Sequence, residues 1–246
     1  MTLVINIGNT NLTLGLADET TFTPTRIPIG GFAGPLAAHA LLQPVLEGKT
    51  LTACAISTVV PEKTALVAQT VQALTGLAPN IVTHEQITLD CTLYETQAGI
   101  DRLICCEAVH AEQPGIPCLV FDLGTATTAN VVDANGRFLG GAITAGVTLG
   151  LEALRSGTSQ LDLPAGESAP ALIGTDMNAC MTTGATLAAA SFLIHYREKI
   201  AAHFGAAPHT VVTGGNVPRI LPHLPPVFTH RPNLLLEGLL RHTKFL

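Results

Sequence analysis

The chain has 246 residues, of which 47% are hydrophobic and only 12% are charged, with a net charge of −6. This much apolar surface offsets the conformational entropy of folding and excludes a disordered chain. The length allows one large domain or two small ones. Because the chain lacks a run of Lys or Arg, nucleic-acid binding has no electrostatic support. A charge content this low, against about a quarter in typical proteins, suggests that a second subunit covers part of the surface.

The N-terminal sequence and the apolar stretches favour a soluble cytoplasmic protein outside the membrane. The start MTLVINIG lacks the basic n-region and long apolar h-region of a signal peptide. The longest uncharged apolar stretch, residues 182–194, is too short to cross a membrane and is followed by charged residues. The six cysteines form no CxxC pair and the nine histidines show no zinc-ligand spacing. We therefore expect reduced cysteines that act as small core residues, and no structural zinc.

The first half of the chain begins with two strands joined by a polar loop. Residues 3–7 form a continuous apolar run, typical of a buried strand, and leucines alternate from position 12 to 16. A helix, a strand, a helix, a strand and a helix are then expected at residues 36–46, 52–60, 62–75, 78–83 and 102–111. Gly76 would end the second of these helices, and Asp101 would lie directly before the third.

The pattern restarts after residues 113–117, QPGIP, which we predict to join an N-terminal domain, 1–114, to a C-terminal domain, 115–246. The expected strands of the second half are 118–121, 128–132 and 210–213, and the expected helices are 150–155, 178–204 and 234–242. Asn135 and Gly136 predict a hairpin turn, since both tolerate positive φ angles.

The restart indicates a duplication. Aligning Asn6 with Asp122 also pairs Gly8 with Gly124, and each glycine follows one buried strand and precedes another. A single strand-to-glycine turn is common in α/β proteins, but two with matching flanks predict duplicated halves. Such a glycine lets backbone N–H groups approach a phosphate, and the Asp122 carboxylate offers a hard oxygen to a cation.

The chain contains neither the GxxxxGK[ST] loop nor the GxGxxG loop of other nucleotide-binding folds. A nucleotide would therefore be held between the two glycine loops, with Gly214 and Gly215 as a third wall beside the adenosine. Asp101 and Arg102 are the remaining candidates for chemistry, as a proton acceptor and an anion-binding group. From spacing alone, a helix N-cap and a surface charge are the more common roles for such a pair. Tyr94 would likewise be structural.

Seven segments in order resemble those of the type III pantothenate kinases over nearly the whole length of the chain. The loop at 5–11 resembles D-x-G-N-T, Tyr94 with 99–102 resembles Y…G-x-D-R, and 122–128 is similar to D-x-G-T-A-T-T. The later segments are 140–146, 173–174, 213–215 and 233–239. No single motif is decisive, but together in this order they are highly specific.

The resemblance implies an α/β fold of duplicated actin-like (ribonuclease H-like) domains, each a mixed sheet flanked by helices. It implies ATP-dependent phosphorylation of pantothenate to 4'-phosphopantothenate, the first step of coenzyme A biosynthesis, by a homodimer. Asp101 would be the general base, and Asp122 would bind a monovalent cation, K⁺ or NH₄⁺, beside ATP with Mg²⁺. The residues expected to bind pantothenate are Tyr94, Gly99, Ile100, Asp101 and Arg102. The residues expected to bind ATP are Asn6, Gly8, Asn9, Thr10, Asn11, Thr13, Thr125, Gly214 and Gly215.

The chain departs from the family pattern at several positions, among them residues 95–97, where the family's asparagine-proline before G-x-D-R is absent. Asn6 stands where the family has an acidic residue, Met177 where it has a threonine that touches pantothenate, and Ala145 where it has a proline. Asn6 keeps the shape of the acid but loses the charge that helps to hold Mg²⁺. These departures motivate an alternative, a weakened or inactive relative that acts as a regulatory or accessory binding protein. A sugar or acetate kinase of the same superfamily is a further alternative, which fits the placement of G-x-D-R less well.

Overall fold

The computed structural model describes residues 1–18, 21–159, 161–162 and 172–243. The chain forms two compact units. Unit 1 comprises Met1–Asp90, Glu95–Ala108 and the segment from Asn233, and unit 2 comprises Cys91–Tyr94 and Val109–Pro232. The domain limits 1–114 and 115–246 stay a prediction, since compactness groups the C-terminal segment with unit 1.

Unit 1 is built on a five-stranded mixed sheet of order β3-β2-β1-β4-β5. The strands are β1 (Thr2–Ile7), β2 (Asn11–Ala17), β3 (Phe22–Pro28), β4 (Ala53–Thr58) and β5 (Asn80–Ile81). β1 pairs antiparallel with β2 and parallel with β4. A short 3₁₀ turn, η2 (His84–Gln86), follows β5.

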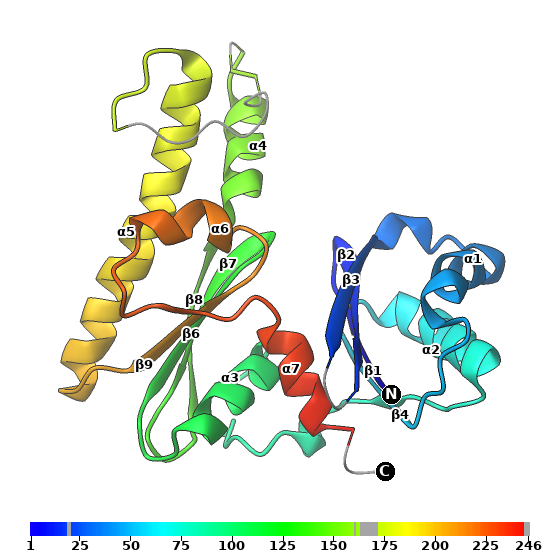
Figure 1. Ribbon diagram of the computed structural model, residues 1–246. Helices are drawn as coiled ribbons and strands as arrows, with labels where there is room; N and C mark the ends of the chain where they lie inside the picture. The colour runs from blue at the N-terminus through cyan, green and yellow to red at the C-terminus, as the bar shows by residue number, and fades with distance from the viewer. Residues whose placement is uncertain (19–20, 160, 163–171, 244–246) are drawn as a thin grey trace. The chain divides into compact units, whose positions relative to one another are not determined.

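Both faces of this sheet are covered, because apolar residues of β1 alternate between two clusters. Leu3, Ile5 and Ile7 pack with α1 (Pro35–Leu46) and α2 (Pro61–Thr75) on one face (Figure 1). Val4, on the other face, packs with residues of α3 (Ile100–Glu112) and α7 (Leu234–Arg241). The face that carries Val4 is also the face of Asn6, two residues further along β1.

Unit 2 repeats the same arrangement. Its sheet has the order β10-β9-β6-β7-β8, with β6 antiparallel to β7 and parallel to β9. The strands are β6 (Cys118–Leu123), β7 (Ala126–Val132), β8 (Phe138–Ala145), β9 (His209–Thr213) and β10 (Thr229–His230). The helices are α4 (Val147–Gly157), α5 (Met177–Phe204) and the short α6 (Val217–Ile220). The predicted α/β duplication is therefore confirmed.

The sequence missed one long edge strand of each sheet, β3 and β8, and also the two-residue edge strand β10. β3 contains Pro24 and Pro28, and proline has no N–H for a sheet ladder, so the segment did not read as a strand. β8 contains Gly140 and Gly141, both with positive φ, which weaken the strand pattern. Edge strands tolerate such residues because only one side of the strand is paired.

Three local expectations need correction. The strand expected at 78–83 is reduced to β5, with two residues. The helix expected at 102–111 begins at Ile100, so Asp101 lies in its first turn rather than before it. In the β7–β8 turn only Gly136 has a positive φ, of 80°, and Asn135 does not share it. The Gly76 stop is confirmed, in the left-handed conformation that favours glycine.

Helix α5 is long and apolar enough to cross a membrane, judged by length and composition alone. Core helices of soluble proteins pass the same test, and Met181, Ala190 and Leu193 of α5 lie in the apolar core of unit 2. Only a third of its most apolar window is buried, however. The expectation from the sequence rested only on the uncharged residues 182–194, a stretch too short to cross a membrane. It therefore underestimated the length of the apolar helix.

No disulfide joins the six cysteines, all of which lie among the described residues, and four of them are buried. Burial raises the pKa of the Cys54 and Cys118 thiols to about 12. Such thiols stay protonated and unreactive at neutral pH, which agrees with their expected role as small core residues.

Candidate functional site

The first loop joins β1 to β2 and, together with these two strands, carries six of the nine residues expected at ATP. Gly8 N donates a hydrogen bond of 3.0 Å to the Asn11 carbonyl, which closes the turn and leaves Asn9 and Thr10 exposed. The Thr10 carbonyl accepts from Ile29 N at 3.0 Å, so the loop is braced from the end of β3. The loop thus presents an amide and a hydroxyl side chain to solvent on a fixed backbone.

Asn6 lies in a row of polar residues that crosses the first sheet. It is paired with Thr13 of β2 and with Ser57 of β4. The buried Ser57 hydroxyl donates a hydrogen bond of 2.8 Å to Asn6 Oδ1. The Nδ2 atom lies 3.6 Å from where a Cβ of Gly8 would be, so the amide N–H₂ is on the loop side. The sequence alone did not identify Ser57, which is 51 residues from Asn6.

The second loop joins β6 to β7 in the same frame. Asp122 is paired with Thr128 and Thr213, as Asn6 is with Thr13 and Ser57. The register leaves residues 124–126 between the last paired residues, against 8–11 in the first loop, so the second loop is one residue shorter. The alignment of Asn6 with Asp122 is confirmed at the level of strand register.

The glycine-rich turn after β9 contacts the second loop. A Cβ at Gly214 would collide with Asp122 Oδ1 and the Leu123 backbone, and its φ of +100° also favours glycine. Asn216 extends this contact, since its N donates to the Leu123 carbonyl at 3.0 Å and its Nδ2 to the Gly124 carbonyl at 2.9 Å. Sequence reasoning missed Asn216, for which an amide directly after the Gly-Gly pair was the available signal.

Asp101 lies in the first turn of α3, where its Oδ1 accepts a hydrogen bond of 2.8 Å from Arg102 N. A Cβ at Gly99 would lie 2.6 Å from the same oxygen, so glycine makes room for the carboxylate. Burial raises the pKa of Asp101 above its ordinary value, and the Arg102 N–H and guanidinium offset only part of this effect. Ile100 packs with Val4, which places α3 on the sheet face that also bears Asn6.

Tyr94 is grouped with unit 2, whereas Gly99, Ile100, Asp101 and Arg102 are grouped with unit 1. The Tyr94 ring packs edge-on against Phe138 of β8, with ring centroids 5.3 Å apart. A Cβ at Gly140 would lie 3.0 Å from this ring. Met177, in the position of the expected threonine, begins α5 and is 53% exposed.

The carboxylates available for a cation are few. Among the described residues, no group of three or more His, Cys, Asp or Glu side chains could hold a metal ion. Asp122 offers one hard oxygen ligand beside a glycine-rich backbone, a donor set that fits a cation whose other ligands are phosphate oxygens. A resident metal with an all-protein ligand shell does not fit these side chains.

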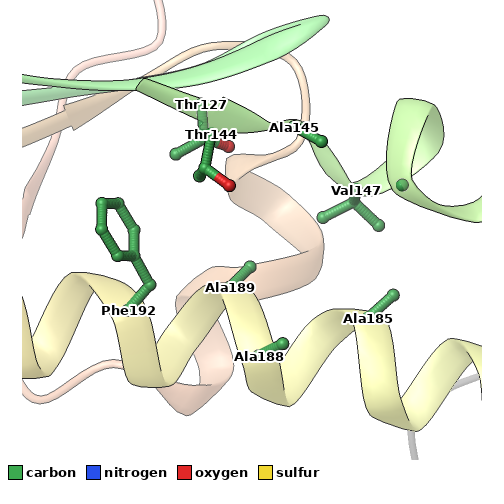
Figure 2. A pocket seen from close by; sticks show the side chains of 10 residues that line it. Thr127, Thr144, Ala145, Val147, Ala185, Ala188, Ala189 and Phe192 are labelled. Atoms are coloured by element: carbon green, nitrogen blue, oxygen red, sulfur yellow. The ribbon is translucent and has the colours of Figure 1, made fainter. Parts of the chain in front are cut away.

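A pocket of about 220 Å³ opens in unit 2 between the β7–β8 strands and helices α4 and α5. Figure 2 shows alanine, valine and phenylalanine side chains around it, with hydroxyl oxygens only from Thr127 and Thr144. Its lining contains none of the residues that the sequence predicted for ATP or pantothenate. No charged side chain lines the pocket, and its walls are mainly apolar.

Comparisons with known proteins agree with this geometry. The family described as type III pantothenate kinase matches residues 2–199. The type III pantothenate kinase of Thermomicrobium roseum is 31% identical over 251 residues, covering 97% of this chain and 95% of that protein. The type III pantothenate kinase of Anaeromyxobacter sp. (strain K) is also 31% identical and covers 97% of each.

Solved structures show the same fold at low identity. A Baf family protein from Campylobacter jejuni is similar with a TM-score of 0.60 and 19% identity, covering 99% of this chain and 100% of that one. A ROK family glucokinase from Streptomyces griseus, in complex with glucose and AMPPNP, has a TM-score of 0.56 and 12% identity, covering 100% and 99%. At these identities the likeness concerns the fold alone, which is the duplicated actin-like fold.

Proposed function

We propose that this chain, which belongs to the type III pantothenate kinase family, uses Asp101 as the general base of its reaction. Membership of the family gives the reaction: ATP-dependent phosphorylation of pantothenate to 4'-phosphopantothenate in coenzyme A biosynthesis, by a kinase that uses ATP with a divalent metal ion. The curated relatives carry this enzyme's name, and neither a regulatory binding protein nor a sugar or acetate kinase gains support from them.

One observation carries the assignment of Asp101: a carboxylate desolvated by burial, in the first turn of α3, on the sheet face that bears the Asn6 row. Desolvation makes a carboxylate more basic, and a base works best when its pKa is raised toward the working pH. Asp101 would accept the hydroxyl proton of pantothenate as that oxygen bonds to the γ-phosphorus and the bond to ADP breaks. Because phosphoryl transfer depends mainly on positioning and charge stabilisation, one placed base is sufficient.

The pantothenate site would consist of Gly99, Ile100 and Arg102 around Asp101, with Tyr94 as a further wall. Arg102 would bind the pantothenate carboxylate, since a guanidinium matches a carboxylate with two parallel hydrogen bonds. Support for Gly99 comes from the 2.6 Å approach that a Cβ there would make to Asp101 Oδ1.

The ATP site would use the side chains and backbone of the two glycine loops. From the first loop and its strands these are Asn6, Gly8, Asn9, Thr10, Asn11 and Thr13, and from the second half Thr125, Gly214 and Gly215. Asp122 would bind a monovalent cation, K⁺ or NH₄⁺, whose charge would offset that of the phosphates. Support comes from its carboxylate at the end of β6 and from the tight packing of Gly214 beside it.

We also propose a cytoplasmic homodimer. Six of the eleven exposed large hydrophobic residues of the described chain lie between positions 143 and 177 in unit 2. They are Ile143, Leu149, Leu154, Leu172, Ile173 and Met177. Figure 1 shows α4 and α5, which carry three of them, side by side. Exposed apolar residues in such number are typical of a protein interface, and the low charge content of the chain agrees with an interface.

The test is a kinase assay on the purified chain with ATP, Mg²⁺, K⁺ and pantothenate, with phosphopantothenate as the product measured. We expect Asp101→Asn to lower kcat at least a hundredfold, because general-base catalysis contributes about 10²–10⁴-fold. Binding of pantothenate should remain. For the wild type, activity should fall on the acid side at a pH above the ordinary aspartate pKa, since the protonated base is inactive and burial raises the pKa of Asp101.

Asp133→Asn is the matched control, because an amide oxygen at this turn can still accept hydrogen bonds from Asn135 N and Arg137 N. It should leave kcat unchanged. If the wild type forms no phosphopantothenate with either K⁺ or NH₄⁺, the proposed kinase activity is refuted. If Asp101→Asn turns over as fast as the wild type, the role of Asp101 as general base is refuted.

A further inference from the structure

Arg26 lies on the edge strand β3, in the same cross-strand row as Asn6. Strand pairing sets Arg26 opposite Thr13, Thr13 opposite Asn6, and Asn6 beside Ser57. Directly paired residues direct their side chains to one face of a sheet. Four polar residues therefore form one row across the sheet of unit 1. The row crosses β1 at Asn6, two residues before Gly8.

The row faces the side of the sheet on which α3 begins. Phe22 of β3 packs with Val4 and Ile100 in one apolar cluster. Arg26 is four residues after Phe22 and so shares its face, because side chains alternate along a strand. The first loop, the helix that carries Asp101, and Arg26 thus belong to one face of one compact unit.

The guanidinium of Arg26 is available to a ligand. The residue is exposed, and within the part of the chain that the structure describes its side chain makes no hydrogen bond or ion pair. The chain has only 12 Lys and Arg residues. A planar, permanently charged group with five N–H donors matches phosphate geometry, and here it lies beside a predicted phosphate loop.

Asn6 adds a donor to the same place. Its Oδ1 accepts the Ser57 hydrogen bond, and its Nδ2 lies on the side of Gly8. An amide N–H₂ donates hydrogen bonds and so binds anions rather than cations. In the second sheet the matching row contains Asp122, Thr128 and, at the position of Arg26, Ile143. That row has a carboxylate and no cation, the opposite charge arrangement.

We propose that Arg26 is a phosphate-binding residue of the first loop, and that with Asn6 Nδ2 it binds the ATP phosphates directly rather than through a carboxylate-held metal ion. β3 lies two strand spacings, about 10 Å, from β1, so a phosphate over the loop lies between Arg26 and Asn6. The inference rests on the proposed function in taking ATP as the anion. The inference adds to that function that the first loop contributes to ATP affinity even without Mg²⁺.

The test is calorimetric titration of the full chain with four ligands: ATP in EDTA, ATP with Mg²⁺, adenosine, and pantothenate. Arg26→Gln should weaken binding of metal-free ATP about tenfold or more, since a charge-assisted hydrogen bond is lost. Adenosine and pantothenate should bind as in the wild type. Arg26→Lys should recover part of the affinity, because the charge remains while the fork geometry is lost.

Arg241→Gln is the matched control, since this exposed arginine at the end of α7 loses the same charge far from β3. Its neighbour His242 accepts a hydrogen bond from Asn80 of β5, which lies at the opposite edge of the sheet from β3. The Arg241→Gln variant should bind all four ligands unchanged. If Arg26→Gln binds ATP as tightly as the wild type, the inference is overturned but the proposed function is not. The same holds if the variant loses as much affinity for adenosine as for ATP, or loses affinity for pantothenate only. A wild type that binds no ATP at all would refute the proposed function, and with it this role of Arg26.

Discussion

The residue at position 6 gives the first loop a neutral amide where the second has the Asp122 carboxylate. Both residues occupy the same register position, each flanked by two hydroxyl-bearing neighbours. The difference lies in charge rather than shape. A carboxylate attracts the metal ion bound to ATP, whereas an amide can donate to the phosphates themselves.

Asn6→Asp separates these two modes of binding. The new carboxylate should lower KM for Mg-ATP about tenfold, since one charged contact is worth about 1.4 kcal/mol. The carboxylate should also weaken the binding of metal-free ATP, because it repels the phosphates and attracts the guanidinium of Arg26. Steady-state kinetics and calorimetry measure the two effects.

Asn135→Asp, at the exposed β7–β8 turn, makes the same chemical change as a control and should alter neither constant. Equal KM values and equal metal-free affinities in Asn6→Asp and wild type would mean that the charge at position 6 has no role in nucleotide binding.

At the scale of elements, Glu107 on α3 joins three segments of unit 1. Its Oε1 accepts from Thr88 N at 2.6 Å and Thr88 Oγ1 at 2.7 Å, and its Oε2 lies 2.7 Å from His242 Nε2. Asn80 Nδ2 donates to the His242 carbonyl at 3.1 Å. These bonds hold the end of α7 and the segment after β5 against the helix that also carries Asp101.

Replacing Glu107 should therefore destabilise unit 1. Glu107→Gln should lower the free energy of unfolding by about 2–4 kcal/mol at pH 7, because it disrupts a buried, fully hydrogen-bonded carboxylate. Burial raises the pKa of Glu107, but the hydrogen bonds from His242 and Thr88 outweigh it and the net pKa is lowered. The carboxylate thus stabilises the fold above its unfolded pKa, and this contribution is lost as pH falls through the lower folded pKa.

Urea unfolding at pH 7 and at pH 3–4 tests this, and the gap between wild type and variant should narrow at the acid pH. Glu112→Gln is the control on the same helix, since its ion pair with Arg231, at 2.9 Å, is partly exposed and worth less than about 1 kcal/mol. A Glu107→Gln protein as stable as Glu112→Gln would contradict the role assigned to this network.

At the scale of the whole molecule, the apolar surface between positions 143 and 177 predicts self-association. Leu154→Asp should shift sedimentation from twice the chain mass of 25.5 kDa to the chain mass itself, because a charge buried at an interface costs several kcal/mol. Leu36→Asp is the control: it replaces an 89% exposed leucine of α1 in unit 1 and should leave the dimer intact. A wild type that sediments at 25.5 kDa at micromolar concentration would contradict the prediction.

The sequence by itself determined the duplicated fold and the two loops. Buried strands and the glycines after them are local patterns, and their repetition at Asn6 and Asp122 identified the frame of both halves. The sequence predicted the ends of helices and strands less accurately, and it did not predict the edge strands β3 and β8. These two strands form only because a neighbouring strand pairs with them. Asp101 was identified through family resemblance, because its spacing alone also fits a helix cap.

Only the tertiary structure decided which distant residues complete the loops. Ser57 reaches Asn6 across 51 residues and Asn216 reaches Gly124 across 92. Arg26 joins the Asn6 row through the register of two strand pairs. Strand register is set by packing of the whole sheet, and a slip of one residue would turn each side chain to the other face. The charge balance of the first loop is therefore a property of the sheet and not of the loop sequence.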